Sequence, residues 1–306
     1  MFKMLLGLCM LLLGIFVMRY GLRKALWHQL HRALEKMTKT PLRGLILGTI
    51  AAALFQSSTT VCLITIGLVG ADYMSFRQAL GVILGANIGT CSTVQLINFS
   101  LPADYILPLI LIAMLLSIFR KFRYVGLALT GLFSMFAGLD LLVKGISGLS
   151  NLNEIAGYLI MAKSQPLYGI WGGIFVTMIF QSSSAATALL MLLADMGLVD
   201  ITTAAYVIYG NNIGSCASSV VFSAAAPIAA RQVALSHIVL NVVGVLVFFP
   251  MTPLLVIAAR FFTGDFSGQV ATIHTLFNLL SSLLVLPLSR QFTNLIFFLM
   301  PNKTKY

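Results

Sequence analysis

The chain carries one unusual pattern twice, 125 residues apart. The stretch 41-PLRGLILGTIAAALFQSSTT-60 matches 166-PLYGIWGGIFVTMIFQSSSA-185, so that Pro41 aligns with Pro166 and Gln56 with Gln181. The register continues without a gap through 81-GVILGANIGTC-91 and 206-YVIYGNNIGSC-216. Upstream, 7-GLCMLLLG-14 matches 131-GLFSMFAG-138 at an offset of 124. An internal repeat of this length predicts two copies of one structural unit.

The repeated pattern lies in long apolar runs. Hydrophobic residues make up 59% of the chain and charged residues 9%, whereas a soluble domain has about 25% charged residues. We therefore predict an all-α integral membrane protein, with residues 1–306 forming a single transmembrane domain that crosses the cell (inner) membrane several times. The net charge of +11 is concentrated in short segments such as 19-RYGLRK-24 and 120-RKFR-123. Contact with membrane lipids explains this excess better than nucleic acid does.

Polar residues interrupt the apolar run 42–69. Only 14 residues of this run precede Gln56, about 21 Å of helix at 1.5 Å per residue. About 20 residues are needed to span a bilayer. Two short arms around a polar break predict a re-entrant helical hairpin carrying the QSS motif, and the same holds for 167–197.

The number of crossings between the hairpins sets their relative orientation. We predict three spans there, at about 78–98, 105–119 and 124–143. An odd number makes the second hairpin enter from the opposite face. The approach to the first hairpin, 19–43, carries seven Lys and Arg residues, whereas 144–166 carries only Lys144 and Lys163. We therefore predict two inverted-topology repeats, about 1–120 and 124–262, an arrangement that places substrate sites near the midplane at the repeat interface.

Further elements follow from periodicity and proline positions. We expect a first transmembrane helix at 1–21 and an interfacial amphipathic helix at 22–37, with a weaker counterpart at 149–161. Segment 232–262 reads as a long helix kinked by Pro250 and Pro253. A further span at 270–286 and an interfacial tail at 288–306, on the cytoplasmic side, complete an extra region of about 270–306.

A broken helix offers two chemically useful ends. The end of the first arm presents carbonyls that suit Na⁺, and the start of the second presents N–H groups that suit an anion. The segments 46–70, 80–98, 170–194 and 204–224 contain no Lys, Arg, Asp or Glu. A bound oxyanion there would lack an arginine, so we expect co-bound Na⁺, held by oxygen ligands, to supply the positive charge. The sequence shows neither a metal-ligand cluster nor a Ser–His–acid set, and we expect a non-enzyme with no cofactor apart from Na⁺ as coupling ion.

The pair QSST and QSSS, each followed 31 residues later by N-I-G, resembles the type II sodium-dependent phosphate cotransporter family in its short bacterial form, without the C-terminal regulatory domain. The resemblance covers about residues 5–287. It implies a transporter that carries inorganic phosphate with sodium ions, and a site formed by the two QSS hairpins. The phosphate ligands expected are Gln56, Ser57, Ser58, Thr59, Gln181, Ser182, Ser183 and Ser184. The sodium ligands expected are Gln56, Ser58, Thr60, Asn87, Thr90, Gln181, Ser183, Asn212 and Ser215.

Other interpretations remain open at this stage. The hydroxyls of one isolated motif would read as helix–helix contacts, and Asn87 and Asn212 would also suit caps at helix breaks. Two His–Asn pairs at i, i+4 spacing favour interhelical hydrogen bonds over ligand binding: His237–Asn241 and His274–Asn278. The alternative functions are transport or export of another small oxyanion, proton coupling, and a channel or structural role. Oligomeric state is left open.

Overall fold

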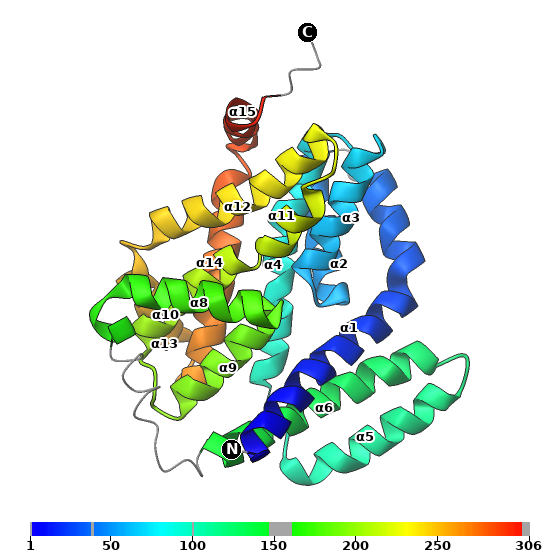
Figure 1. Ribbon diagram of the computed structural model, residues 1–306, viewed down its shortest axis with the longest axis vertical. Coiled ribbons are helices and arrows are strands. Elements are labelled where there is room, and N and C mark those ends of the chain that lie inside the picture. Colours follow the sequence, from blue (N-terminus) through cyan, green and yellow to red (C-terminus); the bar gives the residue numbers. More distant parts are fainter. Residues whose placement is uncertain (1, 38–39, 100, 147–160, 302–306) are drawn as a thin grey trace.

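The computed structural model describes residues 2–37, 40–99, 101–146 and 161–301. Within these ranges every regular element is an α-helix, which confirms the predicted all-α class (Figure 1). The helices are α1 (Phe2–Met37), α2 (Pro41–Phe55), α3 (Ser58–Gly70), α4 (Phe76–Asn98), α5 (Ala103–Ile118), α6 (Arg123–Ile146), α8 (Pro166–Phe180), α9 (Ser183–Asp195), α10 (Ile201–Gly214), α11 (Ala217–Ser223), α12 (Ile228–Phe248), α13 (Thr252–Phe262), α14 (Phe266–Val285) and α15 (Ser289–Leu299).

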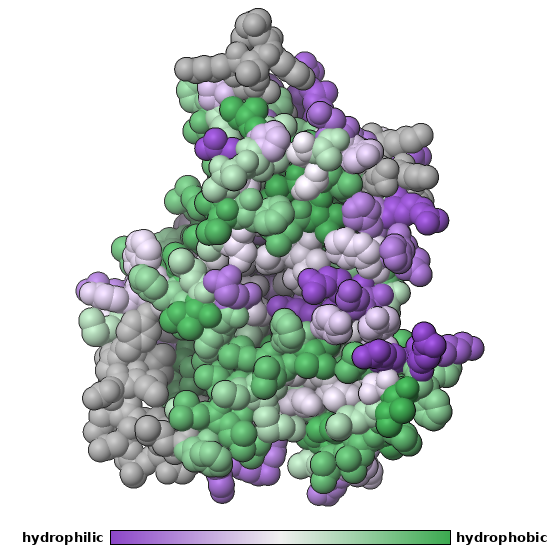
Figure 2. Space-filling view, turned by 45° about the vertical axis from the view of Figure 1, so that its right-hand side comes forward, coloured by the Kyte–Doolittle hydropathy of each residue, from purple (hydrophilic) through white to green (hydrophobic). Residues whose placement is uncertain are grey.

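The surface is that of a multi-pass membrane protein. Among the described residues, five helices are long and apolar enough to cross a bilayer, within Phe2–Leu34, Phe76–Asn98, Arg123–Gly145, Ile228–Phe248 and Phe266–Val285. Helix α5 is shorter, yet its Leu107, Leu111 and Ile118 are all more than half exposed. Figure 2 shows broad areas of hydrophobic side chains above and below a band of more hydrophilic residues. An apolar surface this extensive needs lipid to cover it.

Helices α1 and α6 pack antiparallel through glycines. A side chain added at Gly7 would overlap the backbone at Leu142, one at Gly14 that at Met135, and one at Gly21 that at Ala128. The contacted residues fall as the glycine numbers rise, so the helices run in opposite directions (Figure 1). The two helices carry the sequence match at offset 124. Equivalent helices that lie side by side and antiparallel are what a two-fold axis perpendicular to them produces.

The first QSS segment folds as a hairpin. Gly44 of α2 lies against Gly81 of α4, and Thr49 lies against Gly89, so α2 and α4 run parallel. Only residues 71–75 connect α3 to α4. Helix α3 therefore ends near the level where α2 began, and the chain enters and leaves on one side. The orientation of this hairpin relative to a membrane stays a prediction.

The second QSS segment has the same arrangement. Gly169 of α8 lies against Tyr206 of α10, and Ile174 lies against Gly214, so α8 and α10 also run parallel. Helices α8 and α9 begin and end 125 residues after α2 and α3. One difference follows: α4 is continuous, whereas its counterpart is divided into α10 and α11, with Ser215 and Cys216 between them.

The predicted boundary within α1 is wrong. Residues 2–37 form one helix rather than a transmembrane helix followed by a separate interfacial one. The apolar stripe of 22–37 faces protein, because Leu30 and Leu34 are buried with Leu45 and Phe55 of the first hairpin. The proposed counterpart at 149–161 lies outside the described residues, apart from Met161.

The predicted single helix over 232–262 is also wrong. The chain forms α12 and α13, separated at residues 249–251, because Pro250 cannot continue the hydrogen bonding of α12. Pro253 stands in the first turn of α13, where its missing N–H is harmless. Helix α14 matches the predicted span at 270–286. Helix α15 lies in the predicted tail and buries Phe292 and Ile296.

The glycine contacts predict a stability difference. Gly85→Ala in α4 places a methyl group against the carbonyl of Leu45, and Gly210→Ala places one against that of Ile170. The backbone of the neighbouring helix cannot move away easily, and such overpacking lowers the free energy of unfolding by about 1–3 kcal/mol. We expect lower thermal unfolding midpoints in detergent for both variants. The control is Gly67→Ala in α3, where nothing lies within 4 Å; a Gly85→Ala protein as stable as this control would contradict the packing described.

The inverted topology predicts opposite labelling of two equivalent positions. Thr40 precedes α2 and Gln165 precedes α8, and both residues are exposed. With single cysteines in a cysteine-free background, we expect an impermeant maleimide to modify Thr40→Cys only from the cytoplasm and Gln165→Cys only from outside. Modification of both from one side would indicate a parallel repeat.

Candidate functional site

Each hairpin turns at its motif glutamine. Gln56 has φ 53° and ψ 32°, and Gln181 has φ 51° and ψ 26°. In the described chain, the left-handed region is otherwise occupied by Asp72 and Gly197. A glutamine adopts this conformation at an energetic cost, since its Cβ crowds the carbonyl oxygen. The same strained turn at the same motif position in both repeats is typical of a functional site rather than of a passive loop.

The first serine of each motif caps the second arm. Ser57 Oγ accepts a hydrogen bond from the backbone N–H of Thr60 at 3.1 Å and another from the Thr60 hydroxyl at 3.1 Å. Ser182 Oγ accepts from the N–H of Ala185 at 3.2 Å. Each hydroxyl keeps its own hydrogen as a donor. The predicted role in anion binding therefore rests on these hydroxyl hydrogens and on the free N–H groups of the first turn.

The glutamine side chains have different partners. Gln56 Nε2 donates to the Ala53 carbonyl at 2.5 Å and to Ser92 Oγ at 3.2 Å, while its Oε1 is buried without a partner among the described residues. Gln181 Nε2 donates to the Met178 carbonyl at 2.6 Å, and its Oε1 accepts from Ser218 at 2.8 Å. Gln56 thus keeps one buried acceptor, which suits a cation or a protonated ligand.

The two hairpins meet at a small cavity of about 10 Å³, which is room for roughly one water molecule. Five predicted site residues line it: Thr59 from the first hairpin, and Gln181, Ser182, Ser183 and Ser215 from the second repeat. The other lining residues are Thr177, Gly214 and Ser218. Hydroxyl and amide groups dominate this lining, and oxygen ligands of this kind suit a hard cation. The other predicted residues do not line this cavity.

Asn87 is engaged elsewhere. Its Nδ2 donates to Asn241 Oδ1 at 3.1 Å, and its Oδ1 accepts from His237 Nε2 at 3.2 Å. This confirms the interhelical role predicted for His237 and Asn241, which lie on α12. In the described part of the chain, the corresponding Asn212 donates within its own helix, to the Ile208 carbonyl at 2.9 Å. Asn278 likewise donates to the His274 carbonyl at 2.8 Å.

Asn211 is a structural residue whose role the sequence did not reveal. It accepts from Thr177 of α8 and donates to Thr187 of α9, each at 3.1 Å. It therefore joins both arms of the second hairpin to α10. The first repeat has Ala86 at the equivalent position, so this three-helix link is specific to the second repeat.

An arginine contacts one of the predicted phosphate ligands, although the sequence places no Arg within the motif-bearing segments. Arg19 Nη2 of α1 donates to Ser184 Oγ, in the first turn of α9, at 3.3 Å. Ser184 is completely buried. The sequence suggested only that Arg19 belongs to a basic cluster at the membrane surface. Because 165 residues separate the two partners, no local pattern could have revealed the contact.

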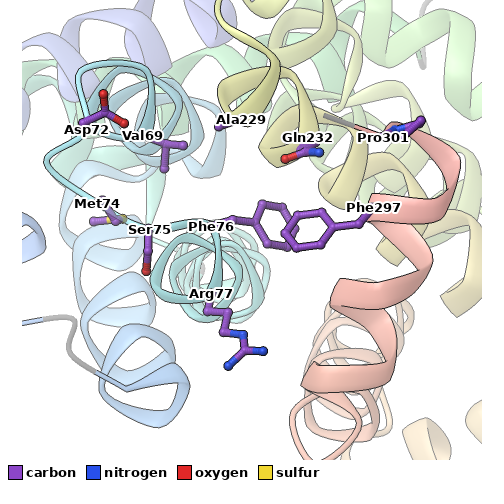
Figure 3. Close-up of a pocket in the computed structure, with 10 residues that line it drawn as sticks. All are labelled: Val69, Asp72, Met74, Ser75, Phe76, Arg77, Ala229, Gln232, Phe297 and Pro301. Carbon is purple, nitrogen blue, oxygen red and sulfur yellow. The ribbon is translucent and has the colours of Figure 1, made fainter. Parts of the chain in front are cut away.

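A larger groove of about 730 Å³ lies away from the hairpin tips (Figure 3). It opens between the α3–α4 turn, α12 and α15, where the rings of Phe76 and Phe297 face each other with centroids 5.1 Å apart. None of the motif residues lines it. We therefore centre the candidate site on the smaller cavity, where polar groups of both repeats converge.

Comparison with known proteins agrees with this geometry. The family model described as Na⁺/Pi-cotransporter matches residues 10–144 and 147–265, which include both hairpins and the α1–α6 pair. The chain belongs to the Na⁺/Pi-cotransporter family. The family resemblance inferred from the motifs is therefore confirmed.

Two relatives of this family member cover nearly its whole length, and a third covers one third of it. It is 32% identical to the uncharacterized protein YqeW of Bacillus subtilis over 95% of both chains. It is 25% identical to the putative inorganic phosphate export protein YjbB of Escherichia coli K12 over 92% of this chain, which spans 52% of YjbB. It is also 30% identical to mouse sodium-dependent phosphate transport protein 2A, over 33% of this chain and 17% of that protein. No solved structure matches the chain.

The different partners of the two equivalent asparagines predict different stabilities for their variants. Asn87→Ala removes the buried hydrogen-bond partner of two atoms, His237 Nε2 and Asn241 Oδ1, which costs about 1–3 kcal/mol. Asn212→Ala makes the same chemical change but removes only a bond within one helix. We expect a clearly lower unfolding midpoint for Asn87→Ala alone, measured by tryptophan fluorescence in detergent. Equal midpoints would contradict the assignment of Asn87 to a structural network.

Proposed function

We propose that this protein transports inorganic phosphate together with sodium ions across the membrane by alternating access, using the tips of the two QSS hairpins as the shared binding site. Membership of the Na⁺/Pi-cotransporter family supports phosphate as the substrate and sodium as the coupling ion. The names of YjbB and transport protein 2A also point to phosphate.

The observation that carries the proposal is one polar cavity, lined by the strained Gln181 turn of the second hairpin and by Thr59 from the start of the helix that follows the equivalent Gln56 turn. Each turn starts a helix whose free N–H groups attract an anion, and each follows a helix whose free carbonyls attract a cation. A single turn of this kind would serve as a structural feature. Here both repeats supply polar groups to the same small volume, the second through its glutamine turn and the first through the Thr59 hydroxyl.

The roles of individual residues follow from their chemistry. The N-termini of α3 and α9, with the hydroxyl hydrogens of Ser57 and Ser182, are donors for phosphate oxygens. The oxygens of Gln181, Ser183 and Ser215 around the cavity are ligands for Na⁺. Thr59 brings a hydroxyl from the first hairpin to the same place.

The size of the cavity implies movement. A space of about 10 Å³ holds a single water-sized species, and phosphate is several times larger. Phosphate must therefore enter when the two hairpins separate on one side or the other. Binding that is possible only after such separation is the essential feature of alternating access.

Sodium coupling is tested by ³²P-phosphate flux in proteoliposomes. We expect uptake to require an inward Na⁺ gradient and to vanish when choline replaces Na⁺. Reversing the gradient reports the direction, and a proton gradient without Na⁺ tests proton coupling. Sulfate in place of phosphate tests a different oxyanion. Phosphate flux that is equal in Na⁺ and in choline would exclude sodium coupling.

The contribution of the hairpin tips is tested with Gln56→Gly and Gln181→Gly. Glycine adopts the left-handed conformation readily, so each change removes the amide and keeps the turn. We expect a loss of at least tenfold in transport with little change in unfolding midpoint. Asp72→Gly is the matched control, because Asp72 is also left-handed but is exposed. Wild-type transport by both glutamine variants would move the site away from the tips.

A further inference from the structure

The side chain of Arg19 lies at the tip of the second hairpin, although the residue belongs to α1. One of its terminal nitrogens donates to Ser184. Its Nε is buried and has no hydrogen-bond partner among the described residues. A guanidinium has five N–H donors in a planar fork. One serine hydroxyl is a weak partner for a group that normally binds carboxylate or phosphate through two bonds.

No carboxylate in the described part of the chain neutralises Arg19. The one ion pair found there joins Lys144 to Asp140. Three other aspartates accept hydrogen bonds at helix starts instead: Asp195, Asp200 and Asp265. Asp72 and Asp104 are exposed. Glu35 is on the same helix, but its backbone position is 16 residues beyond Arg19, about 24 Å further along the helix axis. A charge inside a transmembrane protein without a partner marks a functional site by default.

The surroundings of Arg19 increase its positive potential. Ser184 lies in the first turn of α9, where the helix dipole and the free N–H groups are positive. A guanidinium next to a helix N-terminus is repelled by it, so the arrangement is unfavourable for a protein that binds nothing there. An oxyanion between them removes the repulsion and uses both sets of donors.

We propose that Arg19 is the fixed positive charge of the substrate site, binding the phosphate oxygens together with the start of α9. This rests on the proposed function and changes how it works. Phosphate is neutralised partly by Arg19 and partly by Na⁺, instead of by Na⁺ alone. Ser184 accepts the guanidinium's hydrogen bond when phosphate is absent and yields it to the substrate.

A fixed cation in the site changes two properties of phosphate binding, its dependence on Na⁺ and its dependence on the charge of the phosphate. Phosphate retains measurable affinity in the absence of Na⁺. The doubly charged form of phosphate also binds better than the singly charged form, since attraction to the guanidinium grows with ligand charge. Removing Arg19 then weakens binding most at the higher pH, where the dianion predominates.

The test compares Arg19→Gln with Arg23→Gln in proteoliposomes. Arg23 is one turn further along α1 and is exposed, so its variant makes the same change in net charge without touching the tip. We expect Arg19→Gln to raise the KM for phosphate about 10- to 100-fold, the range of a lost charge-assisted hydrogen bond. The increase should be larger above the second ionisation of phosphate than below it. Arg23→Gln should keep the wild-type KM at both pH values.

Arg19→Lys covers the case in which Arg19→Gln does not fold. Lysine keeps the charge and loses the two-pronged geometry, so we expect a KM raised several-fold with the pH preference retained. A folded Arg19→Gln protein with the wild-type KM would overturn the role of Arg19 and leave the transport proposal standing. Because lysine keeps the charge, an Arg19→Lys protein that lost the preference for the doubly charged form would overturn that role as well. A wild-type protein that carries no phosphate in any salt would overturn both.

Discussion

Helices α2 and α8 end inside the protein, at the QSS motifs. The rest of the site depends on how the free backbone N–H and C=O groups at these breaks find hydrogen-bond partners. In a membrane, no water is available to pair with a free N–H or C=O. The turns at Gln56 and Gln181 redirect the chain within two residues, and Ser57 and Ser182 cap the helices that follow. One cap occupies only one of the four free N–H groups at each helix start. The remaining donors are the source of the anion-binding potential at each tip.

Glycine contacts fix where these tips lie. Helices α2 and α4 touch through backbone atoms, as do α8 and α10, because Gly85 and Gly210 have no side chain to separate them. Backbone contact leaves little freedom for sliding. Each tip is thus held by a closely packed pair of helices, and this firmness explains how strained glutamine turns can persist at both positions.

The features that could be predicted from the sequence are those that a short segment determines. The helix breaks follow from polar residues in apolar runs, and the equivalence of the hairpins follows from the constant register of 125 residues. The continuity of α1 could not be predicted, because it depends on burial of Leu30 and Leu34 beneath the first hairpin. The hydrogen bonds between His237 and Asn87 and between Arg19 and Ser184 join residues at least 150 positions apart. Such contacts depend on the packing of whole helices.

The two tips share a backbone shape but differ in electrostatics, and this difference bears on how one site handles ions of opposite sign. Two identical tips would attract the same ligand twice and would leave two like charges close together. Here Arg19 adds positive charge beside α9, whereas the first tip keeps the neutral Oε1 acceptor of Gln56, which has no partner among the described residues. Under the proposed function, an anion is therefore expected beside α9, and a cation is expected where oxygens from both hairpins converge. Under the proposed function, the departure from symmetry between the repeats is what allows phosphate and Na⁺ to bind next to each other and to stabilise each other.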